Sequence, residues 1–137
     1  LDTAERHGGG VFVLALTSNK EAPQVQHART GRETVAGSVL ADLRRRNAGA
    51  SPMGSLGAVV GATIGDAQEE LAINGPLLVP GIGAQGGSVG DVRRIFADCL
   101  SNVVPSSSRA VLSAGPDPDQ LRAAAEHDIA QFAAALR

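Results

Sequence analysis

Short apolar runs alternate along this chain with longer stretches in which apolar residues recur at helical spacing. The runs Val11–Leu16, residues 56–61 and Leu77–Pro80 consist mainly of aliphatic, often β-branched residues. Continuous apolar runs of this length are typical of strands buried on both faces, as in a parallel sheet. A fourth strand is predicted over residues 109–113, after a polar loop over residues 101–108.

Helical periodicity follows each of the first three strands. Apolar residues three and four positions apart predict a helix over residues 33–47, and the arginines at 44–46 suit its C-terminal end. Those arginines also fit an anion-binding patch, although a solvated helix end is the simpler interpretation. A short helix is expected over residues 66–73, and a longer one over residues 89–100 with Ser88 as N-cap. The buried face of the longer helix is expected to carry Val92, Ile95, Phe96, Cys99 and Leu100.

Both ends of the chain also have helical signals. Asp117 and Pro118 form a strong helix start, an N-cap followed by proline at the first helical position. The last helix is expected to bury a stripe of Leu121, Ala125, Ile129, Phe132 and Leu136. Residues 1–7 are typical of the last turns of a helix, with Gly8 in the left-handed conformation that follows. We therefore expect a fragment of a longer protein; the alternative is a disordered N-terminal tail.

The order of elements defines the fold class. A strand followed by a helix, repeated four times, predicts right-handed crossovers and a parallel sheet, hence an α/β fold. A small open sheet and part of a (β/α)8 TIM barrel both fit this order. A complete barrel needs about 250 residues, whereas this chain has 137.

Composition removes several classes of function. The net charge of −2 argues against a nucleic-acid partner, and no apolar run approaches the ~20 residues of a membrane span. Three Phe without Tyr or Trp provide no aromatic platform for stacking bases. The single cysteine, Cys99, cannot form an intrachain disulfide, which suits a reducing, cytoplasmic compartment. His7, His27 and His127 lack the spacing of metal ligands, so no metal site is expected.

Ligands of parallel α/β folds bind at the carboxyl ends of the strands. Those ends are expected at residues 17–19, 61–63, 80–87 and 106–109, which are small or polar and carry no carboxylate pair. The glycine-rich segment 81–87, followed by a helix start, suggests a phosphate or carboxylate site. It lacks the acidic residue that a dinucleotide site requires, and a flexible turn is the alternative interpretation.

Arg109 is a second candidate ligand residue. It follows three serines, and an arginine fork is suited to binding phosphate through two hydrogen bonds. In isolation, an exposed structural arginine is an equally good interpretation.

Four segments taken together resemble orotidine 5′-phosphate decarboxylase, in particular a bacterial subgroup with Thr-Ser-Asn at a strand end. These segments are residues 16–19, 59–63, 78–87 and 106–110, and Pro-Gly-x-Gly-x-Gln-Gly-Gly with a downstream Ser-Ser-Arg is the most specific part. The resemblance implies a (β/α)8 barrel that acts as a homodimer. Residues 1–137 would be the C-terminal half of that single domain, with strands five to eight and the last helix.

The resemblance also implies roles for individual residues. The substrate-binding residues would be Ser18, Pro80, Gln85 and Arg109, with Gly83, Gly86 and Ser108 in the phosphate loop. Ser18 would contact the pyrimidine, and Pro80 would pack near it. Gln85 would bridge base and phosphate, while Arg109, with backbone near Ser108, would hold the 5′-phosphate. Lys20 departs from the family, in which proline often follows Thr-Ser-Asn.

The reaction implied is the decarboxylation of orotidine 5′-monophosphate to uridine 5′-monophosphate in pyrimidine synthesis, without a cofactor. The family's proton-donating lysine lies in an Asp-x-Lys-x-x-Asp motif, which this sequence does not contain; the only lysine, Lys20, lacks the flanking aspartates. We therefore expect no catalytic residue in this chain, inactivity of the chain alone, and pairing with an N-terminal half. The alternatives are a non-catalytic phosphate-binding half-barrel and another phosphosugar-binding barrel enzyme.

Overall fold

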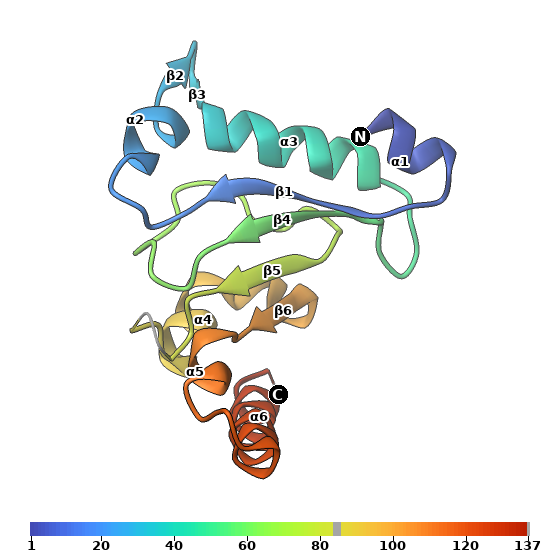
Figure 1. Cartoon of the computed structure of the whole chain (residues 1–137). Helices are drawn as coiled ribbons and strands as arrows, with labels where there is room; N and C mark the ends of the chain where they lie inside the picture. Colours follow the sequence, from blue (N-terminus) through green and yellow to red (C-terminus); the bar gives the residue numbers. More distant parts are fainter. Residues whose placement is uncertain (84–85, 137) are drawn as a thin grey trace.

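Four parallel strands form the main sheet of the computed structural model, which describes residues 1–83 and 86–136. The strands are β1 (Val11–Leu16), β4 (Leu56–Val60), β5 (Leu77–Pro80) and β6 (Val103–Ser106), in the spatial order β1-β4-β5-β6. All four arrows point the same way in Figure 1, so their carboxyl ends lie at one edge of the sheet. The predicted parallel α/β fold is confirmed.

Helices flank the sheet and connect β1 to β4 and β5 to β6, whereas β4 and β5 are joined by irregular chain. They are α1 (Asp2–Arg6), α2 (Ala22–Gln26), α3 (Val35–Asn47), α4 (Val89–Ile95), the 3-10 helix η1 (Ala97–Asn102), α5 (Arg109–Leu112) and α6 (Pro118–Ala135). A short antiparallel ribbon of β2 (Arg29–Thr30) and β3 (Glu33–Thr34) lies between α2 and α3. Neither α2 nor this ribbon was predicted. No helix in the described part of the chain is long and apolar enough to cross a membrane.

Local caps place several helices where the sequence predicts them. Gly8 follows α1 with a positive φ of 67°. The hydroxyl of Thr34 accepts a hydrogen bond from Gly37 N at the start of α3. Asp117 accepts hydrogen bonds from the backbone of Asp119 and Gln120 at the start of α6. The Thr34 and Asp117 caps satisfy backbone N–H groups that have no partner within the helix, and Gly8 has the left-handed conformation that commonly follows a helix C-terminus.

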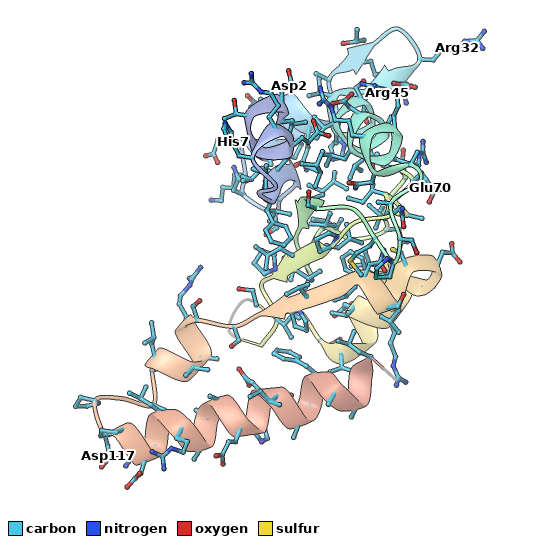
Figure 2. The ribbon with its side chains drawn as sticks, turned by 90° about the vertical axis from the view of Figure 1, so that its right-hand side faces the viewer. Asp2, His7, Arg32, Arg45, Glu70 and Asp117 are labelled. Atoms are coloured by element: carbon cyan, nitrogen blue, oxygen red, sulfur yellow. The ribbon has the colours of Figure 1, made fainter. Side chains whose placement is uncertain are left out.

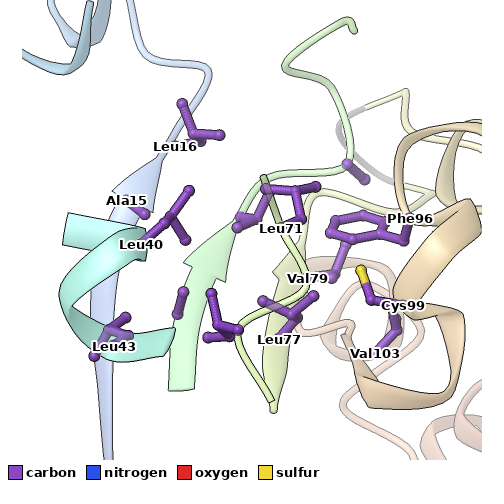
Figure 3. Close-up of a cluster of buried hydrophobic side chains, with 14 of the residues drawn as sticks. Ala15, Leu16, Leu40, Leu43, Leu71, Leu77, Val79, Phe96, Cys99 and Val103 are labelled. Carbon is purple, nitrogen blue, oxygen red and sulfur yellow. The ribbon is translucent and has the colours of Figure 1, made fainter. Parts of the chain in front are cut away.

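The hydrophobic core lies on one face of the sheet, which we call the outer face. Helix α3 packs on β1 and β4 there, with Leu40 and Leu43 buried. Over β5 and β6, Phe96 and Cys99 lie against the strands, as Figure 3 shows. The predicted core face of residues 89–100 is confirmed, although the structure divides it into α4 and η1, with non-helical φ and ψ at Cys99.

The opposite, inner face of the sheet is largely uncovered. Phe12 is 42% exposed, Leu14 70% and Val104 43%. The register pairs Phe12 with Gly57 and Leu14 with Val59, so these positions share one face. The prediction that the first strand is buried on both faces is therefore wrong for the described chain, because no element covers this side.

The fourth strand is formed by a different segment from the predicted one. Residues 103–106 pair with β5, whereas Arg109–Leu112 form helix α5. The predicted polar loop over residues 101–108 therefore contains β6. Pro105 is tolerated in this strand because β6 is an edge strand in the part of the chain described.

Two further predictions are corrected. Residues 66–73 form no helix; Leu71 and Ile73 instead enter the core from irregular chain. Ile129 of α6 is exposed, because α6 packs against α4 and α5 rather than directly on the sheet. Figure 2 shows α6, with Asp117 at its start, lying beside these elements at the far end from α1.

Candidate functional site

The segments that follow the four strands lie at the same edge of the sheet. Residues 17–19 follow β1, residues 61–63 follow β4, and residues 81–87 follow β5, while Arg109 comes three positions after the end of β6. All four therefore lie at the carboxyl edge (left in Figure 1), where ligands bind in folds of this class. The predicted position of the candidate site is consistent with the topology.

A small cavity lies where β5 and β6 end. Its volume is about 70 Å³, and it is lined by residues 80–82 and 106–110. Pro80 and Ser106 are register partners at the last pair of the two strands, so the strand ends form its floor. Pro80, Ser108 and Arg109, three of the predicted site residues, are brought together here.

The guanidinium of Arg109 is available at this cavity. Its side chain is exposed and forms no hydrogen bond or ion pair with any residue of the described chain. By contrast, Arg94 pairs with Asp66 and with Asp91. An exposed arginine next to small hydroxyl residues is suited to an anion with several acceptor oxygens.

Ser107 adds a feature that the sequence analysis did not assign. Its Oγ is buried at the cavity and has no hydrogen-bond partner in the described residues. A buried hydroxyl without a partner is costly and uncommon in folded proteins. An acceptor held by Arg109 would satisfy the Ser107 hydroxyl, so both groups favour an oxygen-rich anion.

The described parts of the glycine-rich segment, residues 81–83 and 86–87, are hydrogen-bonded to one another. Gly83 N donates to Gly87 O at 2.8 Å, and Gly87 N donates to Gly81 O at 3.1 Å. Gly83 and Gly86 have positive φ angles of 71° and 87°, which side chains rarely adopt. Gln85 lies outside the described residues.

The start of α4 is not open to a ligand, contrary to one expectation. Ser88 and Asp91 form a capping box in which Ser88 Oγ accepts from Asp91 N and the Asp91 carboxylate accepts from Ser88 N. Hydrogen bonds from Ser88 lower the pKa of Asp91. The helix start therefore already holds a carboxylate of its own, and the cavity beside Arg109 is the better anion site.

Ser18 lies apart from this cavity. It is exposed after β1, and its side chain forms no hydrogen bond within the described residues. Three strand spacings separate β1 from β6, about 14 Å in a flat sheet. A ligand that touched both Ser18 and Arg109 would have to span the whole edge.

Cys99 and the acidic residues do not form a second chemical site. Burial raises the pKa of the Cys99 thiol to about 11, with smaller effects from Asp98 and Glu70. Cys99 is thus a small core residue, as predicted. The described residues hold no group of His, Cys, Asp and Glu side chains arranged to bind a metal ion.

The fold and this edge define half of a (β/α)8 barrel, with the candidate ligand-binding groups at the carboxyl ends of its strands. The sequence profile of the orotidine 5′-phosphate decarboxylase / HUMPS family matches residues 1–125. This chain belongs to that family.

Individual relatives agree with this assignment. An orotidine 5′-phosphate decarboxylase of Nocardioides is 61% identical over 126 residues, covering 89% of this chain and 45% of that protein. One of Streptomyces coelicolor is 52% identical, covering 100% of this chain and 49% of that protein. A crystal structure assigned to this enzyme from Streptomyces avermitilis has a TM-score of 0.91 and 51% identity, over 98% of this chain and 48% of that one. The chain therefore spans about half the length of the relatives it matches.

Proposed function

We propose that this chain is the pyrimidine- and phosphate-binding half of an orotidine 5′-phosphate decarboxylase. The observation that carries the proposal is the cavity at the ends of β5 and β6, where Arg109 and the Ser107 hydroxyl both lack partners within the described residues. This arrangement supports an anion site at the edge where barrel enzymes bind ligands. The relatives named orotidine 5′-phosphate decarboxylase support a nucleoside monophosphate as the source of the anion.

The proposed roles divide along the edge of the sheet. Arg109 binds the 5′-phosphate with two hydrogen bonds, next to the backbone of Ser108. Pro80 packs near the base, and Ser18 contacts the pyrimidine from the end of β1. Gln85, which lies between Gly83 and Gly86 in the sequence, joins base and phosphate. The separation of about 14 Å between β1 and β6 fits a ligand with the base and the phosphate at opposite ends.

The chemical step uses a residue that this sequence does not contain. The bond between C6 of the pyrimidine and its carboxylate breaks, carbon dioxide leaves, and the electron pair stays on C6. A lysine in the family's Asp-x-Lys-x-x-Asp motif, supplied by the other barrel half, donates the proton to C6. This half contributes binding energy from groups remote from the reacting bond, which can stabilise the transition state. The reaction needs no cofactor.

We also propose an N-terminal barrel half, a second copy in a homodimer, and a cytoplasmic location for the complete protein. The uncovered inner face, with Phe12 and Leu14 exposed, supports the first partner. Sedimentation of the full-length protein tests the dimer. A monomer that turns over substrate at the full rate would contradict it.

Kinetics of Arg109→Ala in the full-length enzyme test the phosphate site. A charge-assisted hydrogen bond is worth about 1.5–3 kcal/mol, so kcat/KM for orotidine 5′-monophosphate should fall by roughly one to two orders of magnitude or more. Gln85→Ala should cost less, because it removes a neutral donor. Arg122→Ala, which changes an exposed arginine on α6, is the matched control and should leave kcat/KM unchanged.

Kinetics with orotidine, the substrate without its phosphate, show whether Arg109 acts by binding the phosphate or by supporting the fold. Arg109→Ala should reduce turnover of orotidine far less, because this substrate has no phosphate to lose. An equal loss on both substrates would show that Arg109 is structural and that the phosphate binds elsewhere.

A further inference from the structure

We propose that Gln26 is a positioning residue that fixes the backbone of Thr17 and thereby holds Ser18 toward the pyrimidine. The inference rests on the proposed function, because the position of Ser18 matters only if a base binds beside it. Its own basis is a side-chain contact at the opposite end of the site from Arg109.

The Gln26 amide makes two hydrogen bonds to one peptide segment. Its Nε2 donates to Thr17 O at 3.1 Å, and its Oε1 accepts from Thr17 N at 3.0 Å. Gln26 is only 9% exposed, and it and Asn47 are the buried polar residues among those described. A buried amide that uses both its donor and its acceptor on one residue holds that residue in one orientation.

Thr17 needs this support because the sheet ends immediately before it. The register between β1 and β4 shifts between Leu14 and Leu16, and Gly61 N donates to Leu16 O at 2.9 Å as the last contact. Thr17 is beyond this ladder, so Gln26 provides the hydrogen bonds that a neighbouring strand would otherwise make. Ser18, the next residue, is therefore attached to a backbone segment that is held in place by hydrogen bonds.

Gln26 is itself held in place by its neighbours. It is the last residue of α2, which packs against β1 and α3. The adjacent His27 places its Nε2 3.5 Å from Gln26 Nε2 and its Nδ1 4.0 Å from the buried side chain of Glu69. Glu69 accepts a hydrogen bond from Thr34 Oγ1 at 2.9 Å. This chain of contacts ties the amide to the start of α3.

If Gln26 acts by positioning Ser18, its substitution should reduce affinity only for ligands that carry a base. In the full-length protein, Gln26→Leu keeps the size of the side chain but removes both hydrogen bonds. Affinity for uridine 5′-monophosphate should fall by up to roughly tenfold, because a displaced Ser18 no longer makes its neutral hydrogen bond to the base. Affinity for ribose 5-phosphate, which has no base, should stay unchanged. Gln24→Leu makes the same change at an exposed position of α2 and should alter neither affinity.

Combining substitutions of Gln26 and Ser18 shows whether Gln26 acts through Ser18 or only stabilises the fold. Ser18→Ala should weaken uridine 5′-monophosphate binding to a similar extent, and the double variant should be no weaker than Ser18→Ala alone. Gln26→Glu, which can still accept from Thr17 N, should recover part of the affinity and provides a second variant if Gln26→Leu folds poorly. The Tm of each variant is measured alongside.

The outcomes separate the two proposals. Equal losses for both ligands, or losses that simply add in the double variant, would make Gln26 structural and overturn this inference alone. Failure of the wild-type protein to bind uridine 5′-monophosphate would overturn the proposed function, and this inference with it.

Discussion

The two faces of the sheet carry similar apolar residues but have opposite surroundings. On the outer face, α3, α4 and η1 cover the strands, and residues such as Leu77, Val79 and Phe96 are fully buried. On the inner face, Phe12, Leu14 and Val104 remain exposed to solvent. The outer face is thus a completed core, whereas the inner face is an apolar surface without a partner in the described chain.

The difference teaches what a half-barrel can complete by itself. Helices α3 and α4, η1 and the irregular segment that carries Leu71 and Ile73 cover the outer face, so residues of the described chain close that side without another half. The inner face of a (β/α)8 barrel is filled by side chains from alternate strands around the whole ring, so four strands leave it open. Coverage of about half of each relative agrees with this division.

The largest difference in the free energy of unfolding is expected between substitutions of two phenylalanines that lie on opposite faces of the sheet. Phe96→Ala removes a ring that is 0% exposed and should lower the free energy of unfolding by about 3–5 kcal/mol. Phe12→Ala removes a ring that is already partly hydrated and should cost only about 1 kcal/mol in the 137-residue chain. Urea unfolding of both variants, at a concentration where sedimentation shows a monomer, measures the difference.

The same pair tests the closure of the barrel. In the full-length protein the cost of Phe12→Ala should rise toward that of Phe96→Ala, because the other half would cover the ring. Equal costs in the 137-residue chain would mean that the inner face is already buried there, and the comparison of the two faces would fail.

Substitution of Asn47 should give the next largest loss of stability, because its side chain joins the end of α3 to the backbone beneath it by hydrogen bonds. Its buried Nδ2 donates to Leu56 O at 2.8 Å and Ile73 O at 3.0 Å, and its Oδ1 accepts from Leu56 N at 3.3 Å. Asn47→Ala leaves these backbone groups without partners, at a cost of about 2–3 kcal/mol in thermal or urea unfolding.

Two other substitutions define what Asn47 contributes. Asn47→Leu restores the lost volume but not the hydrogen bonds, so it should recover little stability. Asn102→Ala changes an asparagine whose side chain accepts a hydrogen bond from its neighbour Ser101, and it should cost less than about 1 kcal/mol. Full recovery by Asn47→Leu would show that packing, not hydrogen bonding, matters at this position.

Local signals predicted most of the fold. The strands of the first three units and α3 followed from the apolar pattern, and the starts of α4 and α6 followed from the caps Ser88 and Asp117. The last strand did not, because Val103–Ser106 and Arg109–Leu112 are both short and weakly patterned. Pairing with β5 selects the first of them, and this long-range contact is absent from local sequence.

The candidate site divides in the same way. The rule that ligands bind after parallel strands predicts Ser18 and Pro80 at one edge, but a strand over residues 109–113 would begin at Arg109 and put it at the opposite edge. The structure brings Arg109 to the same edge as Ser18 and Pro80 because β6 ends at Ser106. The Ser107 hydroxyl could not be singled out among three consecutive serines, because its burial depends on how β6 turns into α5. The contact between Gln26 and Thr17 depends on α2, a helix too short to have a clear periodicity.

Substitution of Arg46 should give the smallest loss of stability, because its ion pairs with α1 and with Asp42 lie at the surface of the protein. It pairs with Asp2 and Glu5 of α1, each at 2.7 Å, and with Asp42 at 3.0 Å; Figure 2 shows Asp2 close to α3. Hydrogen bonds from Arg46 lower the pKa of Asp2 and of Asp42 below the usual value of 3.8. A carboxyl group whose pKa is lower in the folded state stabilises the fold at pH values above its usual pKa. This stabilisation is lost as the pH falls through the lowered pKa.

Arg46→Gln should therefore reduce Tm slightly at neutral pH and low salt, and the difference from wild type should vanish in strong acid and in about 1 M salt. Arg122→Gln, which affects a looser pair with Asp119 at 3.7 Å, should not change Tm. A loss for Arg46→Gln as large as that for Asn47→Ala would mean that charge, rather than apolar burial, holds the outer layer in place.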